Sequence, residues 1–254
     1  MKHLILILLS AAGILLGGAT MNRTGYNQTY SFKMDTLTYV DSSRNRKIPV
    51  ALYRPEQIRP RLIIFSHGYG QNKGGDYLAY SYLTDFLAAK GFFVASIQHE
   101  LFTDELMPAT GIPQIVRRPF WERGADNIQF VINQLKKSCP DLDFNHITLV
   151  GHSNGGDMTA LFPQKYPGIV SKIITLDNRR MSFPYDRNLK IYSLRSGDQP
   201  ADEGVVPTAA EIKRSGMVII KLADIRHDDM DDHANTEQRK VIQKHVLKFL
   251  NDPF

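Results

Sequence analysis

A serine between glycines, in the segment GHSNGG at residues 151–156, is the group in this sequence best suited to nucleophilic chemistry. The segment follows an apolar run at 147–150 and precedes residues 157–162, which are typical of a helix. A serine on a tight turn from a strand to a helix has a strained backbone and an exposed hydroxyl, and flanking glycines avoid the collision that a Cβ would make. The pattern therefore predicts a nucleophile elbow with Ser153 at its tip. A phosphate-binding loop is the alternative, but the lysine of Walker spacing is missing.

A serine hydroxyl is a weak nucleophile and needs a histidine as general base, oriented by a carboxylate. His227 lies after the last expected strand, 218–222, and before the last expected helix, 236–250, where enzymes with this elbow carry the base. We therefore predict that His227 is the base and that the chemistry needs no cofactor. The run HDDMDDH at 227–233 offers metal ligands as an alternative. All of them would come from one loop, so we predict no metal site.

The orienting carboxylate is ambiguous, because two aspartates follow expected strands. Asp177 directly ends one apolar run, and Asp198 lies in the loop after the next one. A charged side chain at the end of a buried strand costs free energy unless it has a partner, which favours Asp177. We predict that Asp177 is the acid and keep Asp198 as the alternative. Asp202 and Glu203, in the same loop as Asp198, are weaker candidates.

A second motif, HGYG at residues 67–70, directly follows another apolar run. In enzymes with a nucleophile elbow, the loop at this place supplies one backbone N–H to the oxyanion hole, and the residue after the serine supplies the other. We therefore expect the backbone N–H groups of Tyr69 and Asn154 to stabilise the negative oxygen of a tetrahedral intermediate. His67 is expected to brace the loop.

The pattern of apolar runs indicates the fold that must hold these groups. An antiparallel hairpin is expected from 29–40 and 47–53, around a polar turn. Further strands are expected at 62–65, 92–97, 147–150, 173–176, 191–194 and 218–222, and helices at 77–90, 121–135, 157–162 and 236–250. Alternating strands and helices predict a mostly parallel central sheet with helices on both faces and the chemistry at the carboxyl ends of its strands. Residues 29–254 are predicted to form one α/β domain.

With these motifs the chain resembles the α/β-hydrolase superfamily, and within it the platelet-activating-factor acetylhydrolase and dienelactone-hydrolase-like esterases. The resemblance covers roughly residues 45–250 and is carried by 65–70, 90–95, 151–156, 176–177 and His227. It implies an α/β-hydrolase fold and an ester-hydrolysing serine enzyme. In the acetylhydrolase group the acid follows the strand after the elbow, the position of Asp177. In the dienelactone-hydrolase group it follows one strand later, nearest to Asp198.

Composition and the N-terminus bear on localisation and partners. The formal net charge of +5 is spread along the chain, so no nucleic-acid-binding arm is expected. Residues 1–19 combine a basic start, an apolar run and small residues, which is typical of a secretory signal peptide, and 20–28 read as a polar tether. We expect a secreted or periplasmic protein, with an uncleaved N-terminal membrane anchor as the alternative. Cys139 is the only cysteine, so no internal disulfide can form.

These features together predict a secreted serine carboxylic-ester hydrolase that works through an acyl-enzyme and takes a small-molecule ester. A peptidase or acyltransferase of the same fold, or a non-catalytic ligand-binding relative, remains open at this point. The loop 101–119 is rich in proline and carries large apolar residues, so it is either a small lid or a solvent loop. Because the chain between 176 and 191 is too short for a helical cap, we expect an open site that prefers short acyl groups.

Overall fold

The computed structural model of the protein describes residues 28–253. The predicted signal peptide (1–19) and, except for Gln28, the predicted tether (20–28) lie outside the described residues. The described chain contains no helix that is long and apolar enough to cross a membrane. The domain prediction for 29–254 stays a prediction, although the strands described below all belong to one sheet.

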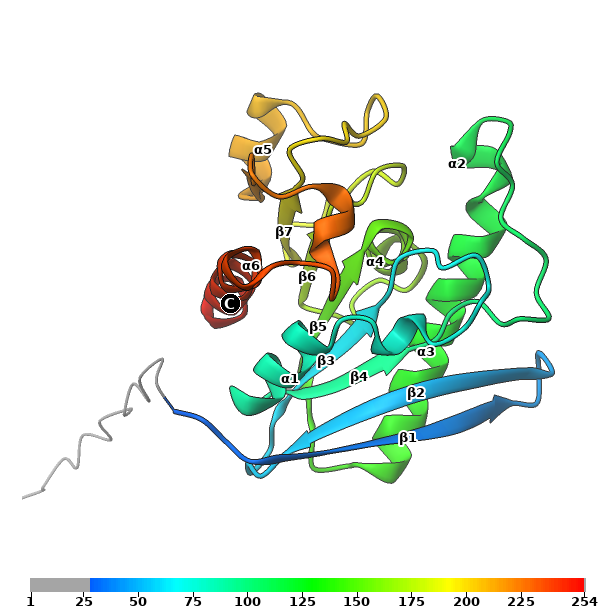
Figure 1. Ribbon diagram of the computed structural model, residues 1–254, viewed down its shortest axis with the longest axis vertical. Coiled ribbons are helices and arrows are strands. Elements are labelled where there is room, and N and C mark those ends of the chain that lie inside the picture. The colour runs from blue at the N-terminus through cyan, green and yellow to red at the C-terminus, as the bar shows by residue number, and fades with distance from the viewer. Residues whose placement is uncertain (1–27, 254) are drawn as a thin grey trace, which may run out of the picture.

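One eight-stranded sheet forms the centre of the molecule, in the order β1-β2-β4-β3-β5-β6-β7-β8 (Figure 1). The strands are β1 (Phe32–Asp41), β2 (Arg46–Pro55), β3 (Arg61–Ser66), β4 (Phe93–Ile97), β5 (Asp143–His152), β6 (Lys172–Leu176), β7 (Lys190–Arg195) and β8 (Val218–Lys221). β1 pairs antiparallel with β2, and β2 pairs antiparallel with β4. The pairs from β4 to β8 are all parallel. The predicted mostly parallel sheet with an N-terminal antiparallel hairpin is therefore confirmed.

Helices cover both faces of this sheet. They are α1 (Ser81–Ala89), α2 (Pro113–Val116), α3 (Arg118–Ser138), α4 (Ser153–Lys165), α5 (Ala209–Ser215) and α6 (Thr236–Asn251), with the 3-10 turns η1 (Asp76–Leu78) and η2 (His227–Met230). Buried residues of α3 and α4 form one core with the sheet, and those of α1 and α6 form a second core on the other face. Burial on both faces explains why the inner strands are continuous apolar runs rather than alternating ones.

The chain from Asp76 to Ala89 differs from the prediction of one helix over 77–90. It forms η1, then a break at Ala79 and Tyr80, and only then α1. The break turns the side chain of Tyr80 into the interior, where it is 3% exposed, and its hydroxyl accepts a hydrogen bond from the Gly68 N–H. Because the apolar pattern is the same for one helix and for two short ones, periodicity could not reveal this tertiary contact.

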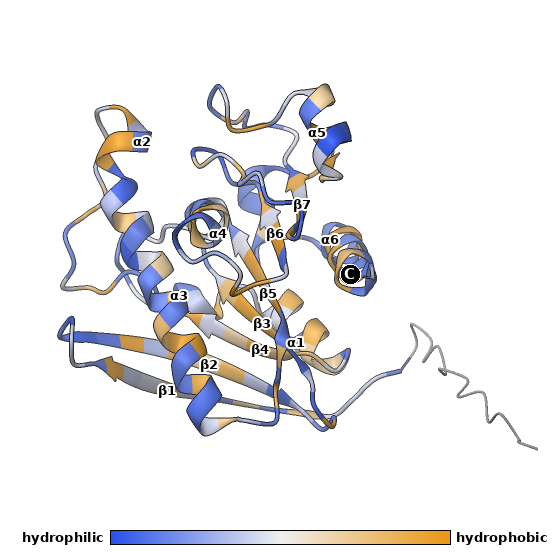
Figure 2. Ribbon diagram, turned by 180° about the vertical axis from the view of Figure 1, so that it is seen from behind, coloured by the Kyte–Doolittle hydropathy of each residue, from blue (hydrophilic) through white to orange (hydrophobic). Residues whose placement is uncertain are grey.

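The loop 101–119 is tied to the rest of the molecule at a few points. The side-chain amide of Asn72 donates to the carbonyl oxygens of Asp104 and Glu105, and the Met107 N–H donates to the Tyr69 hydroxyl. Towards its end the loop forms α2, which was not predicted. Figure 2 colours part of α2 as hydrophobic, and Ile115 within it is 66% exposed.

Candidate active site

Ser153 sits on the turn between β5 and α4, as the elbow motif predicts. Its φ of 51° lies in the left-handed region, which costs a non-glycine residue about 1–3 kcal/mol and persists only where the surroundings enforce it. Two glycines make this turn possible. A Cβ on Gly151 would come within 2.3 Å of the Gly155 carbonyl oxygen, and one on Gly155 within 2.2 Å of the Ser66 carbonyl oxygen. Close packing of β5 against α4 therefore excludes a side chain at Gly151, and close packing of α4 against the end of β3 excludes one at Gly155.

His227 reaches the serine from η2, which follows β8. Its Nε2 lies 2.9 Å from the Ser153 Oγ, and its Nδ1 lies 2.6 Å from Asp177 Oδ2. A carboxylate only accepts, so Nδ1 carries the proton and Nε2 is left to accept the serine proton. This is the tautomer that a general base for Ser153 needs.

Asp177 is the carboxylate that contacts the imidazole. It follows β6 at a φ of 56°, is fully buried, and also accepts a hydrogen bond from the Ser196 N–H. The Arg195 guanidinium lies 3.1 Å from its second oxygen. Burial by itself would raise the pKa of Asp177, but the bond from His227, the Arg195 charge and the bonds from Ser196 together hold it below its ordinary value. The group is thus held as a carboxylate despite its burial.

Asp198, the alternative acid, contacts the main chain of the histidine instead. Its Oδ1 accepts the His227 backbone N–H at 2.8 Å, and its Oδ2 lies 3.4 Å from the Arg226 guanidinium. Asp202 is farther along the same loop, where it accepts from the Gln114 side chain. Of the predicted acids, the structure brings only Asp177 to the imidazole, and Asp198 holds the start of η2.

The predicted oxyanion donors lie in the loop after β3 and in the first turn of α4. The Gly68 N–H is engaged by the Tyr80 hydroxyl, whereas no residue of the described chain accepts the Tyr69 N–H. The Asn154 N–H belongs to the first turn of α4, where backbone donors have no partner within the helix. Both backbone N–H groups are therefore free to bind a negative oxygen.

A hydrogen-bonded chain that the sequence did not reveal joins the loop 67–70 to His227. The His227 carbonyl oxygen accepts from His152 Nε2 at 3.1 Å, so the proton of the neutral His152 ring is on Nε2 and its Nδ1 accepts from the Tyr80 hydroxyl at 2.7 Å. The same hydroxyl accepts the Gly68 N–H. Burial, followed by the proximity of His227, lowers the pKa of His152 to about 3. His152 thus stays neutral at physiological pH and cannot compete with His227 for protons.

A pocket of about 170 Å³ opens above Ser153 and His227. Its lining comes from the loop 67–70, η1 and the loop around η2, and includes Gly68, Tyr69, Asp76, Tyr80, His152 and Asp228. None of the lining residues belongs to the loop 101–119. No group of three or more potential metal ligands occurs in residues 28–253. Among the lining residues, Ser153 has the chemistry of a nucleophile and His227 that of a base.

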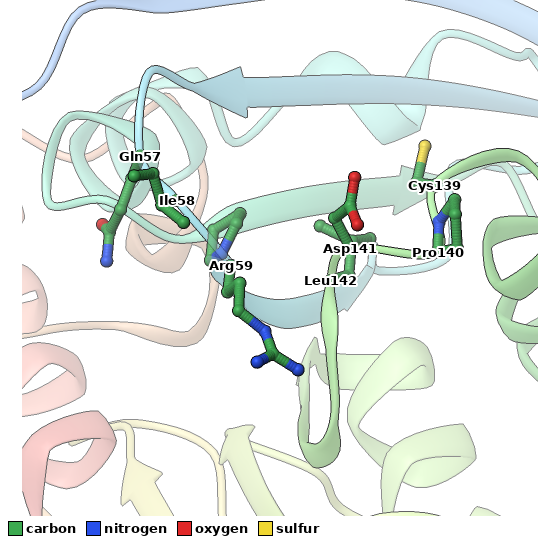
Figure 3. Close-up of a pocket in the computed structure, with 8 residues that line it drawn as sticks. Gln57, Ile58, Arg59, Cys139, Pro140, Asp141 and Leu142 are labelled. Carbon is green, nitrogen blue, oxygen red and sulfur yellow. The ribbon is translucent and has the colours of Figure 1, made fainter.

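A second hollow lies at the amino ends of β3 and β5, between the β2–β3 loop and the α3–β5 loop (Figure 3). Its lining includes Arg59, Asp141 and the free thiol of Cys139. The thiol's one hydrogen-bond contact within the described chain is the Ser138 hydroxyl, at 3.7 Å. Without a base beside the sulfur, this hollow lacks the arrangement that activates a nucleophile.

The structure also shows buried partners of the site that sequence reasoning missed, namely Tyr80, Glu100, Trp121 and His152. Glu100 carried a usable signal, because it comes only three residues after the fully buried strand β4. For Tyr80 and Trp121 there was no such signal, since both also fit the apolar face of a helix.

Solved structures similar to this one share its fold at low sequence identity. Esterase Est22 matches with a TM-score of 0.63 and 11% identity over 87% of this chain and 82% of that one. A dienelactone-hydrolase-like promiscuous phosphotriesterase, P91, from metagenomic libraries, matches with 0.62 and 12% over 86% and 98%. A putative dipeptidyl aminopeptidase IV from Bacteroides ovatus matches with 0.58 and 16% over 89% of this chain and 36% of that one. No family model matches the sequence, and no curated protein shows significant sequence similarity to it.

Proposed function

We propose that this chain, which has the α/β-hydrolase fold, is a serine carboxylic-ester hydrolase that works through an acyl-enzyme. The observation that carries the proposal is the position of the His227 imidazole, 2.9 Å from the Ser153 hydroxyl and 2.6 Å from the Asp177 carboxylate. The chain order of serine, aspartate and histidine is the order found in hydrolases with a nucleophile elbow. The esterases among the similar structures support the same reaction class.

In the proposed mechanism, His227 Nε2 takes the proton of Ser153 as its Oγ attacks the ester carbonyl carbon. The backbone N–H groups of Tyr69 and Asn154 stabilise the resulting oxyanion, each worth about 3–4 kcal/mol when preorganised. The imidazolium, held by Asp177, then gives its proton to the leaving alcohol as the carbon–oxygen bond breaks. Water hydrolyses the acyl-enzyme by the same steps, with His227 again as the base.

Replacing the nucleophile tests this proposal directly. Ser153→Ala is expected to reduce hydrolysis of p-nitrophenyl acetate to background, because no other activated nucleophile lines the pocket. A fluorophosphonate probe is expected to label the wild-type protein on Ser153 and to leave the variant unlabelled. Circular dichroism checks that the variant is folded. Undiminished turnover in Ser153→Ala would rule the mechanism out, and an unlabelled wild type would favour a non-catalytic relative.

We further propose that the enzyme prefers short acyl groups. The pocket above Ser153 is only about 170 Å³, and residues 177–189 between β6 and β7 contain no helix that could form a cap. A long acyl chain would therefore stay in water rather than being buried. p-Nitrophenyl acetate and butyrate are expected to be hydrolysed with a higher kcat/KM than the palmitate ester. Faster turnover of the palmitate ester would contradict the preference, and cleavage of peptide p-nitroanilides would favour a peptidase instead.

Secretion or export to the periplasm is part of the proposal, and it rests on the N-terminal sequence alone. The basic and apolar segment 1–19 is the support for it. Mass spectrometry of the N-terminus of protein recovered from the producing cells is the test. A mature chain that still begins at Met1 would favour the membrane-anchored alternative.

A further inference from the structure

Glu100 is a buried carboxyl group close to the nucleophile that the mechanism does not use. It follows β4, is 2% exposed, and its Oε1 accepts a hydrogen bond from the Asn154 side chain at 2.8 Å. Its Oε2 has no hydrogen-bond partner in the described chain and lies 3.8 Å from His67 Nε2. A carboxyl group in so dry a place costs folding free energy, so its position calls for an explanation.

The orientation of the Asn154 side chain follows from its two partners. The Trp121 indole N–H can only donate, so the oxygen of the Asn154 amide faces it, at 2.8 Å. The amide nitrogen then faces Glu100, which must accept. Trp121 is fully buried and Asn154 is 6% exposed, so water does not replace either bond. The Asn154 side chain is therefore fixed at both ends.

This side chain belongs to the residue whose backbone matters most to the proposed oxyanion hole. Asn154 follows Ser153, which is held at a φ of 51°, and its N–H is one of the two proposed donors. The carboxyl group that fixes it also packs beside His67, the residue that begins the loop of the other donor, Tyr69. His67 is itself held there, because its Nε2 accepts the His99 backbone N–H at 3.0 Å. Glu100 thus lies between the supports of both donors.

We propose that Glu100 is a positioning residue of the oxyanion hole, acting through the side chain of Asn154. The inference rests on the proposed esterase function. Glu100 is buried and is not among the residues that line the pocket above Ser153, so the proposed role is indirect and needs no contact with the substrate. Its role needs only a hydrogen-bond acceptor at the position of Oε1, and an uncharged side chain of the same shape supplies one. Charge and geometry can therefore be separated by substitution.

Glu100→Met removes the acceptor at nearly constant volume. Loss of a whole oxyanion donor lowers kcat about 10²–10³-fold, and a misplaced donor costs less. We expect kcat for p-nitrophenyl acetate to fall about 10- to 100-fold while KM changes less than threefold, because the oxyanion exists only in the transition state. The affinity for a boronic acid, which forms a tetrahedral adduct on the serine, is expected to fall in proportion to kcat/KM. Glu100→Gln, which keeps an acceptor, is expected to restore kcat to within about threefold of the wild type.

Asn127→Leu is the matched control. Asn127 is also fully buried, and its side-chain amide has no hydrogen-bond partner in the described chain. This variant measures how the fold alone responds when a buried polar side chain is replaced by an apolar one, and its kcat is expected to equal that of the wild type.

Trp121→Phe removes the other bond to Asn154 and keeps a large ring, so it tests the same support if Glu100→Met does not fold. It is expected to lower kcat about three- to tenfold at unchanged KM.

The outcomes separate this inference from the proposed function. If the wild type is active and labelled on Ser153, but folded Glu100→Met or Trp121→Phe keeps the wild-type kcat and boronic acid affinity, the inference is wrong and the esterase proposal stands. A loss in Glu100→Met that Glu100→Gln does not reverse also overturns it, because the charge would then be what matters. An inactive, unlabelled wild type overturns both.

Discussion

β6 and β7 are neighbouring parallel strands, so the loops that follow them begin next to each other at the carboxyl ends of the strands. The aspartates in these two loops contact different atoms of His227. Asp177 is fully buried at a φ of 56° and contacts the His227 imidazole, with Arg195 at its other oxygen. The Asp198 side chain is 32% exposed and accepts the backbone N–H of the same histidine. One carboxylate therefore orients the ring, and the other orients the chain that carries the ring. Both residues are aspartates that follow neighbouring parallel strands, Asp177 directly after β6 and Asp198 three residues after β7, and they differ in burial and in the atom of His227 that each contacts.

The largest effect is expected from Asp177→Asn. An asparagine there can donate to Nδ1 and so favours the tautomer in which Nε2 carries the proton and cannot accept one from Ser153. By analogy with the serine-protease triad, kcat is expected to fall on the order of 10⁴-fold. Initial rates with p-nitrophenyl acetate, normalised to protein that is folded by circular dichroism, provide the measurement. Near-normal turnover would show that the contact at 2.6 Å is not catalytic.

A much smaller effect is expected from Asp198→Ala. The substitution removes the acceptor of the His227 N–H, a partly exposed hydrogen bond worth about 1 kcal/mol. We expect kcat to fall up to about tenfold, because the histidine chain loosens while the ring keeps its partner. Asp198→Asn keeps an oxygen at the same place and is the matched control, with nearly wild-type turnover. A loss in Asp198→Ala as large as that in Asp177→Asn would end the distinction between the two loops.

The smallest effect on turnover, but a clear one on stability, is expected from Asp157→Asn. The buried Asp157 Oδ1 accepts the N–H groups of Arg179, Arg180 and Met181, which fixes the loop after Asp177. Burial raises the pKa of Asp157 to about 6, although the bonds from this loop lower it. The folded state therefore binds the proton more tightly than the unfolded state does. This contribution to stability is complete below about pH 4 and is lost as the pH rises to about 6.

Asparagine keeps the accepting oxygen and does not ionise. Relative to the wild type, Asp157→Asn is expected to gain up to about 3 kcal/mol in the free energy of unfolding between pH 4 and pH 7. Urea unfolding curves of both proteins at the two pH values measure this difference. A stability difference that does not change with pH would mean that Asp157 has the same pKa in the folded and unfolded states, so that its burial does not favour the protonated form.

Local patterns were sufficient for much of the fold. The hairpin, the parallel strands and the elbow follow from periodicity, from the polar turn and from glycines that steric contact requires. Elements whose pattern was not distinctive were missed. α5 is short and has no buried residue, so there was no apolar stripe to find, although its Thr208–Glu211 capping box is a readable signal. The break before α1 depends on Tyr80, whose partner Gly68 lies in another loop.

For the site, the sequence by itself was enough to predict Ser153, His227 and the two proposed backbone donors, because each prediction depends on a motif or on chain order that local geometry explains. The choice between Asp177 and Asp198 was left to the tertiary structure. Because β6 and β7 are parallel neighbours, both aspartates lie beyond the carboxyl ends of the strands. Only the paths of the two loops decide which carboxylate reaches the Nδ1 of His227. The contacts of Asn154 with Glu100 and Trp121 were decided in the same way. These contacts join residues from three separate elements, and a hydrogen bond of that kind depends on packing that no single segment encodes.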